Sequence, residues 1–107
     1  MDQATSDKIE AAVLRKLLKH LALRTDVQNI DLMGISGFCR NCLSDWYKEA
    51  AEEAGIDIDK GAARDHIYGM PAGEFKEKYQ KPATDDQLQA MNDSVALNEK
   101  LRAGTDW

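Results

Sequence analysis

The chain of 107 residues contains only two prolines and seven glycines, so long stretches are free of residues that interrupt helices. It also has no excess of basic residues. Nineteen acidic side chains outnumber fourteen basic ones, and the formal net charge is −5. A nucleic-acid-binding domain normally carries a basic face, so we expect no nucleic-acid partner.

Long apolar runs are absent as well. No stretch approaches the roughly 18 apolar residues that a membrane-spanning helix needs. Residues 1–7 lack the basic and then apolar arrangement of a signal peptide. We therefore expect a cytoplasmic protein with no membrane partner, in which the two cysteines are reduced.

What the sequence does contain is apolar side chains at helical spacing, with no convincing strand pattern and no repeat. This predicts an all-α fold: residues 1–107 form a single compact domain, an irregular bundle of five or six helices, and residues 103–107 form a frayed tail. The predicted helices cover residues 6–24, 26–33 and 37–54, a segment from Asp57 or Asp59 to Tyr68, one that begins at Pro71, and one that begins after Thr84.

Helix boundaries follow from capping residues. Thr25 and Thr84 each precede a glutamine by three positions, the pattern of a capping box. Thr5 or Ser6 is predicted to cap the first helix, Gly34 to end the second, and Ser36 and Gly55 to bound the third. In the last helix the residues predicted to face inward are Leu88, Met91, Val95 and Leu101.

The most distinctive motif is the CxxC pair formed by Cys39 and Cys42. With Ser36 as the cap, Cys39 falls in the first turn of a helix, where free N–H groups favour a thiolate. Both cysteines also lie on the apolar stripe that contains Trp46, and this favours buried structural thiols without a cofactor. The alternatives are a zinc site, with His20 as a further ligand, or a thiol-redox pair.

A run of hydrogen-bonding side chains over residues 24–31, together with Arg40 and Asn41 between the cysteines, predicts either a binding or reactive surface or a corner between helices. The sequence has no catalytic triad and no phosphate-binding loop, so we assign no catalytic or cofactor-binding residue and lean against an enzyme. His66 is interpreted as a surface or packing residue. The candidate surface consists of Arg24, Asp26, Asn29, Asp31, Arg40 and Asn41.

The sequence contains three separate motif blocks, which are residues 24–33, 37–47 (GFCRNCLSDWY) and 67–71 (IYGMP). Together they resemble a family of short proteobacterial proteins catalogued as a domain of unknown function, and the likeness covers about residues 9–81. The resemblance implies a small bacterial protein that is entirely helical and has no assigned activity. Ala72 and Phe75 stand where the family pattern favours aromatic residues after Met-Pro.

The first predicted helix and the stripe around Trp46 and Tyr47 offer more apolar surface than a small monomer readily hides. We therefore expect a helical protein-interaction module that forms a homodimer, with another protein partner as a further possibility. Charge is also uneven. Residues 1–24 carry five basic and three acidic side chains, a net charge of +2, so the remainder carries −7.

Overall fold

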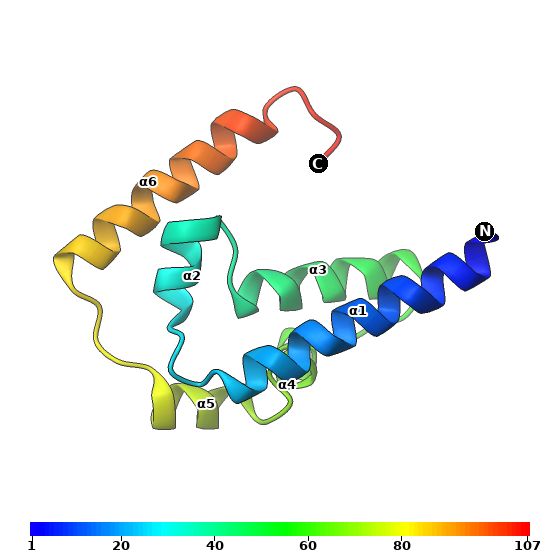
Figure 1. Cartoon of the computed structure of the whole chain (residues 1–107), viewed down its shortest axis with the longest axis horizontal. Coiled ribbons are helices and arrows are strands. Elements are labelled where there is room, and N and C mark those ends of the chain that lie inside the picture. Colours follow the sequence, from blue (N-terminus) through cyan, green and yellow to red (C-terminus); the bar gives the residue numbers. More distant parts are fainter.

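The computed structural model describes all residues from 1 to 107 and contains six helices and no strand, which confirms the all-α prediction (Figure 1). None of the helices is long and apolar enough to cross a membrane. The helices are α1 (Gln3–Leu23), α2 (Asn29–Ser36), α3 (Arg40–Glu53), α4 (Lys60–Tyr68), α5 (Ala72–Tyr79) and α6 (Asp85–Arg102).

The core lies where α3 and α4 pack against each other, with α5 and the last turns of α1 alongside. The N-terminal half of α1 extends away from it, and α6 contacts mainly α2 (Figure 1). The radius of gyration is 15.4 Å, whereas a compact chain of this length has about 13 Å. The buried core side chains are Leu21, Leu43, Ile67, Tyr68 and Phe75.

The first helix begins earlier than predicted. Asp2 is its N-cap, and the carboxylate accepts a hydrogen bond of 2.7 Å from the backbone N–H of Thr5. The predicted caps, Thr5 and Ser6, lie inside the helix. Thr5, Ser6 and Asp2 all have side chains that can cap a helix. The carboxylate of Asp2 also interacts favourably with the positive end of the helix dipole.

The second helix begins three residues later than predicted, because the proposed capping box at Thr25 does not form. Gln28 instead uses its side chain for long-range contacts: it donates to the carbonyl of Tyr79 at 2.8 Å and accepts from the N–H of Lys81 at 3.0 Å. Gly34 does not end the helix. Gly37 does, with a φ of 78° that favours glycine.

This shift also moves the start of α3. Ser36 is the last residue of α2, and its hydroxyl donates to the carbonyl of Leu32 at 2.7 Å. Cys39 is the N-cap of α3, in extended backbone, so it does not lie in the first turn as predicted. Three other boundaries agree with prediction: Asp59 caps α4, Thr84 forms a capping box with Gln87, and Gly55 follows α3. Pro71 is the N-cap of α5, so this helix begins one residue later than predicted.

The face that α6 turns towards α2 is mostly polar. Asn98 donates to the carbonyl of Gly37 at 2.8 Å. A Cβ at Gly34 would lie 3.2 Å from that of Ala90, so the glycine permits the close approach of the two helices. Met91 is half-buried, as predicted. Leu88, Val95 and Leu101 are exposed, and the prediction that they face inward is wrong.

The last five residues are not helical, but their terminal side chain makes defined contacts. The ring of Trp107 packs edge-on against that of Trp46, with centroids 5.5 Å apart. The Arg102 guanidinium lies 4.1 Å from the centroid of the Trp107 ring. Trp46 is half-buried and packs at the rim of the core.

Candidate functional site

Arg40 lies at the centre of the most connected part of the molecule, with only 2% of its surface exposed. Its guanidinium donates to four neutral oxygens and lies 4.8 Å from the centroid of the Phe75 ring. Those oxygens are the backbone carbonyls of Leu21 (3.3 Å), Arg24 (2.9 Å) and Val27 (2.8 Å) and Oδ1 of Asn29 (3.0 Å).

This arrangement provides hydrogen-bond donors for backbone carbonyls at the C-terminal end of α1. The last carbonyls of a helix have no partner within the helix and carry the negative end of its dipole. Arg40 donates to two of them, those of Leu21 and Arg24, and so caps α1 from the first turn of α3. No carboxylate touches the guanidinium, and burial lowers the pKa of Arg40 from its ordinary value.

Tyr68 extends the network to α4. Its hydroxyl donates to Oδ1 of Asn41 at 2.6 Å and accepts from the amide of Asn29 at 3.0 Å. Burial raises the pKa of the Tyr68 hydroxyl, and the hydrogen bond from Asn29 works against that rise. Since Asn29 also accepts from Arg40, one chain of hydrogen bonds joins α1, α2, α3 and α4.

The structure divides the predicted surface residues into two groups. Asn29, Arg40 and Asn41 come together in the buried network. Arg24 and Asp26 form an exposed ion pair with two hydrogen bonds of 2.9 Å, and this pair lowers the pKa of Asp26. Asp31 is exposed and accepts from the amide of Gln87 at 3.0 Å. The six residues therefore do not form one surface.

Both cysteines are free thiols, Cys39 buried and Cys42 half-buried. The Cys42 thiol donates to the sulfur of Met33 at 3.6 Å. Burial raises the pKa of the Cys39 thiol, and the charge of Cys42 adds to that rise, while the backbone N–H of Cys42 works against it. No three side chains among His, Cys, Asp and Glu converge, and His20 is not brought to the cysteines.

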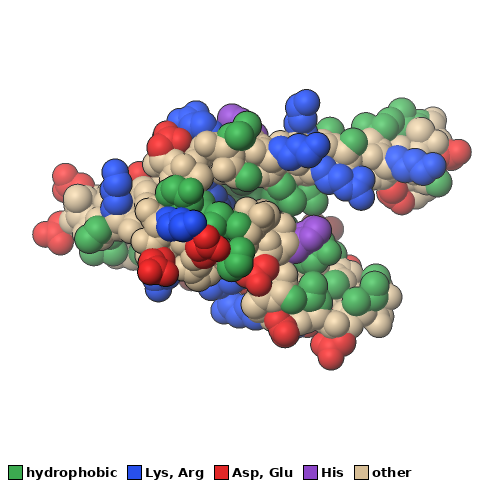
Figure 2. Space-filling view, turned by 90° about the horizontal axis from the view of Figure 1, so that it is seen from below, with side chains coloured by type: hydrophobic (Ala, Val, Ile, Leu, Met, Phe, Trp, Pro, Cys, Tyr) green, Lys and Arg blue, Asp and Glu red, His purple; other side chains and the backbone are tan.

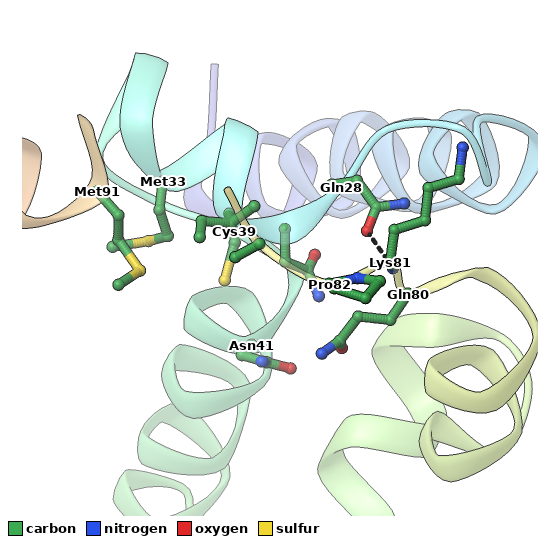
Figure 3. Close-up of a pocket in the computed structure, with 11 residues that line it drawn as sticks. Gln28, Met33, Cys39, Asn41, Gln80, Lys81, Pro82 and Met91 are labelled. Atoms are coloured by element: carbon green, nitrogen blue, oxygen red, sulfur yellow. Dashed lines mark hydrogen bonds between the residues drawn. The ribbon is translucent and has the colours of Figure 1, made fainter. Parts of the chain in front are cut away.

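A cavity of about 320 Å³ opens beside Cys39. In Figure 3 the sulfur of Cys39 points into it, and the hydrogen bond between Gln28 and the backbone of Lys81 lies at its edge. Asn41 connects the cavity to the Arg40 network. Its lining includes Gln28, Asn29, Met33, Cys39, Asn41 and Met91.

Sequence reasoning missed three contributors to this region: Tyr68, Met33 and Met91. Tyr68 lies in the third block of the family resemblance, which offered a signal for it. The two methionines lie in different helices, 58 positions apart, and no spacing pattern links them. His66 is exposed and stacks on Tyr47 with ring centroids 4.5 Å apart, a packing role.

Comparison with known proteins connects this region to a family. No curated protein matches the chain. The family model described as "Protein of unknown function (DUF1244)" matches residues 27–93, which include Arg40, Asn29 and Tyr68, both cysteines and all of the cavity lining. Because that match covers more than half of the sequence, the chain belongs to the DUF1244 family of proteins of unknown function.

Proposed function

We propose that the protein is a helical interaction module that self-associates, and that a second copy covers the surface which one chain leaves open. The observation that carries this proposal is the accessible surface of 7819 Å². A folded monomer of 11.9 kDa has about 6,000 Å². The difference, about 1,800 Å² per chain, exceeds the roughly 800 Å² that each partner buries in a stable interface.

One part of this surface is an apolar stripe on α1. Leu21, at the C-terminal end of the helix, is buried in the core. Further out the stripe becomes exposed: Leu14 is 39% exposed, Ile9 48% and Val13 65%. These side chains follow helical spacing, so they present one face to a partner helix.

A second apolar surface borders α2 and α6. A hollow of about 430 Å³ lies between these helices, with Ile35, Leu97 and Leu101 on its edges. All three side chains are more than half exposed. A groove with apolar edges is the kind of surface that accepts the apolar face of a helix.

Charge favours pairing of the two surfaces with each other. The Lys and Arg side chains of α1 gather along the projecting arm in Figure 2. The chain beyond residue 24 carries a net charge of −7, and α6 has four acidic and two basic side chains. Two α1 arms would repel each other, whereas α1 of one copy and α6 of the other attract.

We therefore place the α1 stripe of each copy in the α2/α6 hollow of its partner. The two contacts are equivalent by two-fold symmetry, so the assembly closes as a dimer. Sedimentation equilibrium at micromolar concentration tests this directly. The expected mass is twice the 11.9 kDa of one chain.

Matched variants locate the interface. Val13→Asp and Leu97→Asp each place a charge in one of the two surfaces, and both are expected to yield monomers with unchanged helical circular dichroism. Leu88→Asp is the control, because Leu88 is an exposed apolar residue of α6 that does not line the hollow. A wild-type chain that stays monomeric at every concentration overturns the proposal. Dissociation by Val13→Asp alone would overturn the placement in the hollow.

A further inference from the structure

Three sulfur-containing side chains line the cavity beside α3, those of Met33, Cys39 and Met91, and a fourth, Cys42, contacts one of them. Cys39 caps α3, Cys42 lies one turn further on, Met33 belongs to α2 and Met91 to α6. The thiol of Cys42 is 3.6 Å from the sulfur of Met33. Met33, Cys39 and Met91 line the same cavity, and Figure 3 shows the three side chains around it.

The cavity lining contains no carboxylate and no imidazole; besides the sulfur residues it consists of amide side chains, aliphatic residues and Lys81. Cys42 and Met33 also border a neighbouring hollow with Asp45, Glu49 and Glu99, but these carboxylates do not converge with the cysteines. Zinc sites complete their four ligands with Cys, His, Asp or Glu, and no such set converges in this chain. Thiolate and thioether ligands together select soft ions such as Cu(I).

The nearby charge also favours a monovalent ion. Arg40 follows Cys39 directly, is buried, and donates only to neutral oxygens, so its positive charge has no counter-charge in contact. Two thiolates would bring a charge of −2. One monovalent cation and Arg40 then balance it, whereas a divalent cation would leave an excess positive charge in a buried region.

The start of α3 can support the thiolate form. Burial raises the pKa of Cys39, and the backbone N–H groups of Cys42 and Asn41 act against that rise. Free N–H groups at a helix N-terminus stabilise a negative sulfur. A cation that binds the sulfurs replaces two thiol protons, and its positive charge offsets the cost of burying the thiolates.

We propose that Cys39, Cys42 and Met33 bind one Cu(I) ion, with Met91 next to them as a fourth sulfur. Two S–H bonds break, two Cu–S bonds form, and both protons leave to solvent without any change in oxidation state. The Met33 thioether adds a third, neutral ligand. Since the ligands come from α2 and α3, and Met91 from α6, the ion would tie α6 to the centre of the molecule.

Anaerobic titration of the reduced protein with Cu(I), against the chromogenic chelator bicinchoninate, tests the site. We expect one equivalent per chain and release of two protons. Ag(I), a redox-inert soft ion, should bind with the same stoichiometry and raise the melting temperature. Zn(II) should not be held under the same competition.

Variants separate this site from an ordinary pair of thiols. Met33→Leu nearly preserves volume, and it should weaken Cu(I) binding at least about tenfold, because loss of even an outer-shell partner costs 10–100-fold. Met70→Leu is the control, since Met70 packs against the core and lies outside the cavity. Equal affinities for the two variants would overturn the site, as would a preference for Zn(II). Cys42→Ser should abolish stoichiometric binding.

Discussion

The Arg40 network and the outer half of α1 invert the usual distribution of polarity. A guanidinium is 2% exposed, while Val13 on α1 is 65% exposed. The buried charge is tolerated because the guanidinium donates to three backbone carbonyls and one amide oxygen. Buried oxygens of this kind need a hydrogen-bond donor. The exposed apolar side chains have no such compensation within one chain. Polar contacts thus set the internal geometry, and the apolar stripe is available for association.

The segment matched by the family model includes Arg40 but not α1. Residues 27–93 contain Asn29, Arg40, Asn41 and Tyr68, and all of α1 lies before them. Yet the network reaches across that boundary, because Arg40 donates to the carbonyls of Leu21 and Arg24. The position of α1 on the molecule therefore depends on a side chain of the matched segment.

Replacing Arg40 should produce the largest effect. Arg40→Met keeps much of the volume but leaves buried carbonyls without donors, and we expect a loss of about 3–5 kcal/mol in the free energy of unfolding. Urea denaturation measures this. Arg40→Lys should recover only part of the loss, because an ammonium lacks the planar fork that spans several acceptors. A loss below about 1 kcal/mol for Arg40→Met would show that the network does not stabilise the fold.

Tyr68→Phe removes one hydroxyl from the same network. Asn29 and Asn41 each lose a hydrogen bond, and we expect a cost of about 1–2 kcal/mol in the same denaturation experiment. Tyr79→Phe is the matched control. The hydroxyl of Tyr79 makes no hydrogen bond, so its loss should change stability by no more than about 0.5 kcal/mol. Equal effects of the two substitutions would contradict the network.

Val13→Ala addresses the opposite region and should have the smallest effect. At concentrations where the chain is monomeric, we expect no loss of stability and a gain of up to about 0.5 kcal/mol, since alanine has the higher helix propensity. Leu21→Ala, on the buried part of the same stripe, should cost about 2–5 kcal/mol. A substantial cost for Val13→Ala in the monomer would mean that its own chain covers the stripe.

Local sequence patterns predicted all six helices because their signals are local. Asp59, Thr84 and the glycines after α3 and α4 act within one turn of their own positions. The capping box at Thr25 failed for a non-local reason: the side chain of Gln28 bonds to backbone groups more than fifty residues away. The inner face of α6 was mispredicted because Gly34 of α2 lets Ala90 approach closely, and because the carbonyl of Gly37, which follows α2, accepts a hydrogen bond from Asn98.

The candidate site was only partly predictable for the same reason. Arg40, Asn29 and Asn41 were selected as polar residues, yet charged residues are rarely buried, so a surface was the natural interpretation. Arg40 is buried because the last turn of α1 and the loop after it pack against α3. The sequence of one segment alone does not predict that contact. The sulfur cluster likewise depends on α6 lying over α2, a contact between distant segments.

The attachment of α6 has a consequence for motion. This helix contains no buried residue and rests mainly on α2, and its hydrogen bond from Asn98 to Gly37 closes a loop of 61 residues. Such an element opens at a lower free energy than the core does. Its amide protons would therefore exchange with solvent through local excursions in which the Arg40 network stays folded. Each excursion would lift Met91 from the cavity wall, giving a small ligand a transient route to the thiol of Cys39.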